Sequence, residues 1–174
     1  TQCKFCNLNA SIEDGRSAGL FVPVTINLED TVEAYKIRVA EVGPLVEGRF
    51  NMGGFMDTEQ EAKIHYGFVE KIAAAAPHKP FLHLHAQAWD RKNLQRLKDA
   101  GLDCFCVQLE VMDPKMFPEI CPGKAKHMPY EGWIESILNA KDVYGGHNVG
   151  VKLVPGITLF APSGHKTWEE ALDY

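Results

Sequence analysis

The strongest constraint on the fold is a regular alternation of short strand-like segments with longer helical ones. Segments rich in apolar and β-branched residues predict strands at 49–52, 80–87, 103–111 and 148–154. Helical periodicity and end signals predict helices at 31–46, 57–76, 91–100 and 129–144, and another beginning near Thr167. Strands that alternate with helices of about 10 to 20 residues form βαβ units around a parallel sheet. The proline-rich stretch 112–128 predicts a long active-site loop with one helical turn.

Each predicted strand has one apolar face and one polar face. Alternate residues of a strand point to opposite sides. The polar faces carry Arg49, Asn51 and Gly53; His83, His85 and Gln87; Cys104, Cys106, Gln108 and Glu110; and Gly150, Lys152 and Val154. An interior lined by so many polar groups is too costly to bury without a ligand. A doubly wound sheet would be apolar on both faces, so the pattern favours a partial TIM-like (βα) barrel.

The carboxyl ends of the strands are where such a barrel carries its active site. Gly53, Gln87, Glu110 and Lys152 are predicted to lie at or near those ends. We therefore expect a polar ligand to bind close to these four residues.

Length and charge indicate one domain and exclude some partners. The 174 residues are 45% apolar, enough for one core, and residues 1–174 are interpreted as a single barrel core cut at both ends. The net charge of −5 is spread along the chain without a basic stripe, so nucleic acid is not expected. No apolar run reaches the roughly 18 residues of a membrane span, and no secretion signal begins the chain. We expect a cytoplasmic protein with no membrane partner.

The five cysteines do not have the spacing of a disulfide scaffold. Cys3 and Cys6 form a CxxC, Cys104 and Cys106 a CxC, and Cys121 stands apart. A CxxC of reduced thiols indicates a metal or redox site. Packing is the favoured role for Cys104 and Cys106, with an auxiliary metal as the alternative.

Cys3, Lys4, Phe5 and Cys6 resemble the end of the CxxxCxxC signature of radical S-adenosylmethionine (radical SAM) enzymes. The signature's first cysteine would stand two positions before Thr1. The resemblance implies a [4Fe–4S] cluster that binds S-adenosylmethionine (SAM), an electron donor such as flavodoxin or ferredoxin, and a 5′-deoxyadenosyl radical. That radical would abstract hydrogen from a small molecule or cofactor precursor. Biotin synthase and hydrogenase-maturation enzymes are the most similar branches.

The resemblance also assigns cofactor-binding residues. Gly53 and Gly54 match the family's glycine-rich motif, although Phe55 stands where many members have Glu. Glu110 matches a contact to the ribose or amino group, and Lys152 a partner for the cofactor carboxylate. Phe5, between the two cysteines, is assigned to the same site.

Two other functions fit parts of the sequence. His83 and His85 form an HxH pair that could serve a zinc-dependent barrel hydrolase, although no further ligand is evident. The CxxC could instead hold a structural zinc ion. In the radical SAM interpretation, His83, His85 and Gln87 contact substrate or form hydrogen bonds in the barrel interior. Glu110 and Lys152 could also simply pair with each other.

Overall fold

The computed structural model describes residues 27–43, 48–51, 58–75, 79 and 81–173. The predictions at Cys3, Phe5, Cys6, Gly53 and Gly54 lie outside these residues.

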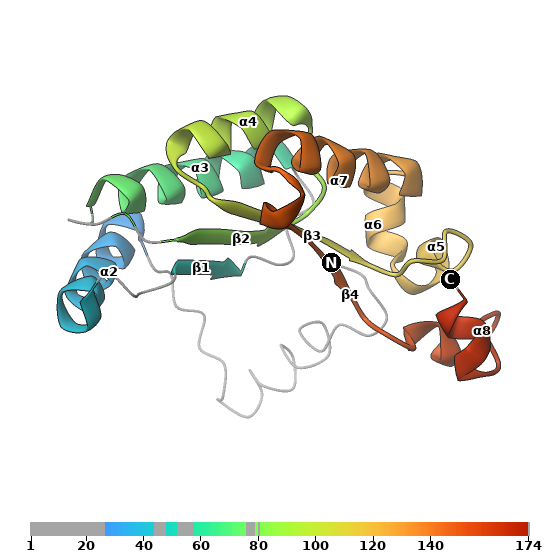
Figure 1. The fold of residues 1–174 in the computed structure, drawn as a ribbon. Helices are drawn as coiled ribbons and strands as arrows, with labels where there is room; N and C mark the ends of the chain where they lie inside the picture. The colour runs from blue at the N-terminus through green and yellow to red at the C-terminus, as the bar shows by residue number, and fades with distance from the viewer. Residues whose placement is uncertain (1–26, 44–47, 52–57, 76–78, 80, 174) are drawn as a thin grey trace.

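The strands form one parallel sheet in chain order. β1 (Gly48–Asn51), β2 (Leu82–Ala86), β3 (Cys104–Glu110) and β4 (Val149–Leu153) lie side by side in the order β1-β2-β3-β4. Each adjacent pair is parallel. Helices connect consecutive strands and lie over one face of the sheet, as Figure 1 shows for α3 (Thr58–Ala75), α4 (Arg91–Ala100) and α7 (Tyr130–Tyr144). The predicted α/β class with parallel strands is confirmed.

Capping residues set the ends of the helices. In α4, the Asp90 side chain accepts a hydrogen bond from the Asn93 backbone N–H, and Gly101 ends the helix in the left-handed region. The helix predicted at 31–46 is α2 (Leu28–Val42), which begins earlier and ends earlier than expected. Asn27 caps its first turn, and Gly43, with a φ of 73°, ends it.

The prediction of a long loop at 112–128 is wrong in its second half. Two short helices occupy it, α5 (Phe117–Ile120) and α6 (Pro122–His127). Proline stands in the first turn of both helices, where its missing N–H costs no hydrogen bond. Prolines that suggest a loop in the sequence therefore begin helices here. Short 3-10 turns, η2 (Gly146–Asn148) and η3 (Ile157–Phe160), flank β4, and α8 (Trp168–Leu172) begins where the sequence predicts a helix.

The hydrophobic core lies between the sheet and α3, α4 and α7. Leu82, Leu84, Phe105, Val107 and Leu109 are completely buried and belong to one apolar cluster with residues of these helices. The predicted division into an apolar and a polar face therefore holds for β2 and β3. It weakens along β4, because Val151 and Leu153, on the predicted apolar face, are 38% and 39% exposed.

Two buried hydrogen bonds fix α7 in place. The Tyr144 hydroxyl donates to the carbonyl oxygen of Leu94 in α4 over 2.9 Å, and burial raises the pKa of that phenol well above its ordinary value. The Trp89 backbone N–H donates to the Ser136 hydroxyl over 2.7 Å. These bonds tie α7 to α4 and to the segment that follows β2. No helix within the described ranges combines the length and apolarity that a membrane crossing needs.

Matched leucine substitutions test this core. Leu97 in α4 is 1% exposed, whereas Leu138 in α7 is 55% exposed. Leu97→Ala should lower the free energy of unfolding by about 2–5 kcal/mol, because it removes buried apolar surface and leaves a cavity. Leu138→Ala should change it by less than about 0.5 kcal/mol. Urea unfolding followed by circular dichroism measures both, and similar losses for the two variants would contradict the helix placement.

Candidate functional site

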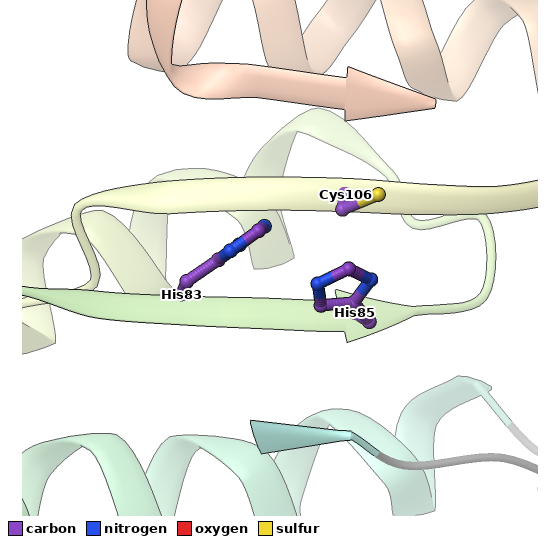
Figure 2. A group of neighbouring side chains, drawn as sticks. All are labelled: His83, His85 and Cys106. Atoms are coloured by element: carbon purple, nitrogen blue, oxygen red, sulfur yellow. The ribbon is translucent and has the colours of Figure 1, made fainter. Parts of the chain in front are cut away.

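The polar face of the sheet brings together two histidines and one cysteine. His83 and His85 project from the same side of β2, and His85 lies directly opposite Cys106 of β3 in the strand register. The two imidazole ring centres are 4.3 Å apart. One ring nitrogen from each histidine and the Cys106 sulfur all lie within 4.8 Å of one another. Figure 2 shows the two side chains of β2 beside Cys106 on the neighbouring strand.

β4 lies next to Cys106 on the side opposite β2. Gly150 lies opposite Cys106 in the register, and a Cβ added there would be 3.0 Å from the Cys106 sulfur. Burial raises the pKa of the Cys106 thiol, and the nearby Cys104 and Glu110 raise it further, while the charge of Lys152 lowers it. The thiol is therefore protonated at neutral pH unless a cation displaces the proton.

Glu110 ends β3 in a backbone conformation that is unusual for its type. Its φ is 74°, and no other non-glycine residue in the described ranges has a positive φ. The pairing register between β3 and β4 shifts between Val107 and Glu110, so a bulge lies here. Bulges and positive φ values at a strand end redirect a side chain and occur often at functional sites.

A buried lysine holds the Glu110 side chain. The Lys124 ammonium lies 3.3 Å from Glu110 Oε1 and also donates to the Gln108 carbonyl oxygen. It lies 4.9 Å from the ring centre of Trp133. The side chains of Lys124 and Glu110 are only 2% and 11% exposed. The predicted Glu110–Lys152 alternative is therefore wrong: α6 supplies the partner, and Lys152 is exposed.

A cavity of about 360 Å³ lies at the carboxyl ends of β3 and β4. Its lining combines Glu110 and a mainly apolar wall with Asp113, Thr158 and His165. His165 Nε2 is 3.3 Å from Asp113 Oδ2, and its Nδ1 is 2.9 Å from the Thr158 hydroxyl oxygen. This is the end of the sheet at which the sequence predicts ligand binding, and the volume falls in the usual range for a ligand pocket.

The site residues predicted from the sequence lie in different parts of the structure. Glu110 lines the cavity, while His83 and His85 lie with Cys106 on the face of the sheet. Gln87 follows β2 and is 3% exposed. Lys152 is exposed on β4.

Sequence reasoning missed Lys124, Asp113 and His165. Lys124 lies 14 residues from its partner Glu110, and 52 residues separate Asp113 from His165. No local spacing links these pairs, so only the fold could reveal them. The single available signal was a lysine among prolines in the predicted active-site loop.

Removing the buried ammonium tests its role. Lys124→Met should lower the free energy of unfolding by about 3–5 kcal/mol, because it leaves the Glu110 carboxylate buried without its partner. Lys126→Met in the same helix is the matched control, since Lys126 is exposed and should tolerate the change. Denaturant unfolding of both variants measures the difference. Equal stabilities would show that the buried pair contributes nothing.

Known proteins share part of this sequence and of this fold. No protein-family profile matches the chain. Bacteriochlorophyllide c C-7(1)-hydroxylase of Chlorobaculum limnaeum is 29% identical over 103 residues, which are 54% of this chain and 25% of that protein. HydG, a maturase of the [FeFe]-hydrogenase, has a similar structure, with a TM-score of 0.61 and 14% identity over 82% of this chain and 31% of the HydG chain. The chain thus spans about a quarter to a third of these relatives.

HydG is a hydrogenase maturase, and hydrogenase-maturation enzymes are one of the two branches of radical SAM enzymes that the sequence resembles. The structural match confirms the fold class, and the two matches together confirm the predicted resemblance to radical SAM enzymes. They leave the substrate and the reaction unassigned, since the chain covers only part of each relative.

Proposed function

We propose that this chain is the core of a radical SAM enzyme that cleaves SAM reductively and abstracts hydrogen from a small molecule or cofactor precursor. The observation that carries the proposal is the cavity at the carboxyl ends of β3 and β4, lined by Glu110, on a scaffold similar to HydG. A cytoplasmic location accords with this function, which requires a low-potential electron donor such as flavodoxin or ferredoxin.

Cys3 and Cys6 are proposed to hold the [4Fe–4S] cluster with a third cysteine two positions before Thr1. When bound, the cluster supplies one electron and an open iron site for the amino and carboxylate groups of SAM. Cys104, Cys106 and Cys121 serve other roles, since the signature's spacing is met by Cys3 and Cys6.

Several residues are proposed to position SAM. The Gly53 and Gly54 backbone approaches the methionine part, because a side chain there would block it. Glu110 contacts the ribose or amino group. Among the described residues Lys124 contacts Oε1 of Glu110, so Oε2 is the oxygen that we assign to SAM. Lys152 pairs with the SAM carboxylate, and Phe5 packs beside the cofactor.

The substrate is proposed to bind over the polar face of the sheet, within reach of His83, His85 and Gln87. The two relatives are named for different roles, a bacteriochlorophyllide hydroxylase and a hydrogenase maturase. A scaffold that serves different roles supports the general reaction class, radical SAM chemistry, and does not indicate one substrate.

Anaerobic reconstitution with iron and sulfide tests the proposed function. The full-length polypeptide, including the residues before Thr1, should become brown and release methionine and 5′-deoxyadenosine when SAM and a reductant are added. Cys3→Ala and Cys6→Ala should abolish both the visible absorbance and the cleavage, because each removes a thiolate ligand. Cys104→Ser is the matched control and should retain both.

The rival functions predict different outcomes of that experiment. Stoichiometric zinc at Cys3 and Cys6 with no cluster would support a structural zinc domain. Zinc-dependent hydrolysis that survives loss of Cys3 and Cys6 would support the hydrolase. Either result contradicts the proposal.

The proposed role of Lys152 gives a prediction for SAM affinity. Lys152→Ala should weaken SAM binding about ten- to a hundredfold, the effect of losing a hydrogen bond to a charged group. Lys141→Ala in α7 is the control, since that lysine is exposed on a helix of the opposite face. Isothermal titration of the reconstituted protein measures both. Equal affinities for the two variants would remove Lys152 from the cofactor site.

A further inference from the structure

We infer that His83, His85 and Cys106 form a binding site for one divalent late first-row metal ion of the zinc type. Its ligands are different residues from Cys3 and Cys6, which are proposed to hold the cluster. The inference rests on the proposed function, because the metal ion would bind the substrate at the histidines of β2 that are proposed to face it.

The donor set identifies the class of ion. Two imidazoles and one thiol are the ligand types that Zn²⁺ and its neighbours prefer, whereas Mg²⁺ and Ca²⁺ require oxygen ligands. No carboxylate belongs to the group formed by the described residues. The ligands found among the described residues therefore favour a zinc-type ion over a hard cation.

The geometry is close to that of a bound metal. Zn–N and Zn–S bonds of about 2.0–2.1 Å and 2.3 Å place tetrahedral ligand atoms about 3.3–3.7 Å apart. The three donor atoms lie within 4.8 Å of one another, so side-chain movements of about 1 Å bring them to coordination distance. Neighbouring strands hold them there, since His85 and Cys106 are register partners.

Gly150 of β4 is the register partner of Cys106. The absence of a side chain at Gly150 leaves room for the sulfur, which would otherwise meet a Cβ at 3.0 Å.

Among the residues that the structure describes, three supply ligands, which would leave one position of a tetrahedral ion for a further donor. This arrangement is typical of metal ions that bind water or a substrate group, whereas structural zinc sites use four protein ligands. Cys106 precedes Glu110 by four residues, or about 13 Å along an extended strand. The open position would therefore take a nitrogen, oxygen or sulfur donor of a substrate that lies deeper over the sheet than the ligand of the cavity.

Cobalt binding tests this site without the cluster. Co²⁺ and Zn²⁺ are titrated into the full chain carrying Cys3→Ala and Cys6→Ala, so neither of those thiols can bind the metal. We expect one equivalent of Co²⁺ to bind with a thiolate-to-cobalt absorption band, and Zn²⁺ to displace it. Adding Cys106→Ser should remove the band and weaken binding at least tenfold, and His83→Ala or His85→Ala should weaken binding to a similar degree.

Two control variants change a thiol and a histidine outside the proposed ligand set. Cys104→Ser changes the other thiol of β3, and His147→Ala changes an exposed histidine. Both should leave the band and the affinity unchanged. Absence of the band in the starting protein, its survival in Cys106→Ser, or its loss in Cys104→Ser would each overturn the inference.

A second variant keeps the inference testable if Cys106→Ser does not fold. Gly150→Ala retains every ligand but places a methyl group against the sulfur, so it should weaken Co²⁺ binding. Circular dichroism checks the fold of each variant. The variant used for cobalt binding cannot assemble the cluster, so the two experiments are independent. Loss of cobalt binding would contradict the metal site alone, and loss of SAM cleavage would contradict the proposed function alone.

Discussion

Burial of one face of a parallel sheet under α3, α4 and α7 is the constraint from which the rest of the molecule follows. Apolar side chains at alternate positions of β2 and β3 pack into that core. The intervening side chains must then point to the opposite face, whatever their chemistry. That face collects His83, His85 and Cys106 on neighbouring strands, and the parallel direction places the ends of β3 and β4 together at one edge.

The buried pair of Lys124 and Glu110 stands at that edge. Removing two charges from water is costly, and their attraction offsets the cost only with good geometry and further partners. Lys124 has such partners in the Gln108 carbonyl oxygen and the Trp133 ring. Lys124 of α6 thus places its ammonium at the end of β3, next to the Glu110 carboxylate. The backbone of Glu110 is strained there, with a positive φ. A carboxylate held in this way is well suited to orient a polar ligand.

Two chemically different environments therefore lie along β3. At its carboxyl end, a mainly apolar cavity is lined by the Glu110 carboxylate and by the His165–Asp113 pair. Nearer its middle, the described residues that gather are nitrogen and sulfur donors, with no carboxylate among them. In the proposed function, the cofactor in the cavity and the substrate over the sheet would be held separately, the first by hydrogen bonds and the second by the metal ion. The proposed radical chemistry requires such fixed placement, since only a correctly positioned hydrogen is abstracted.

The sequence by itself determined the alternation of strands and helices, the polar face of β2 and β3, and the place of Glu110 at a strand end. These features depend on local periodicity and on caps such as Asp90 and Gly101, which act within a few residues. Only the tertiary structure decided that Lys124 pairs with Glu110 and that Cys106, rather than Cys104, joins the two histidines. The reason is physical: strand register and the packing of α6 bring together residues whose separation along the chain carries no signal.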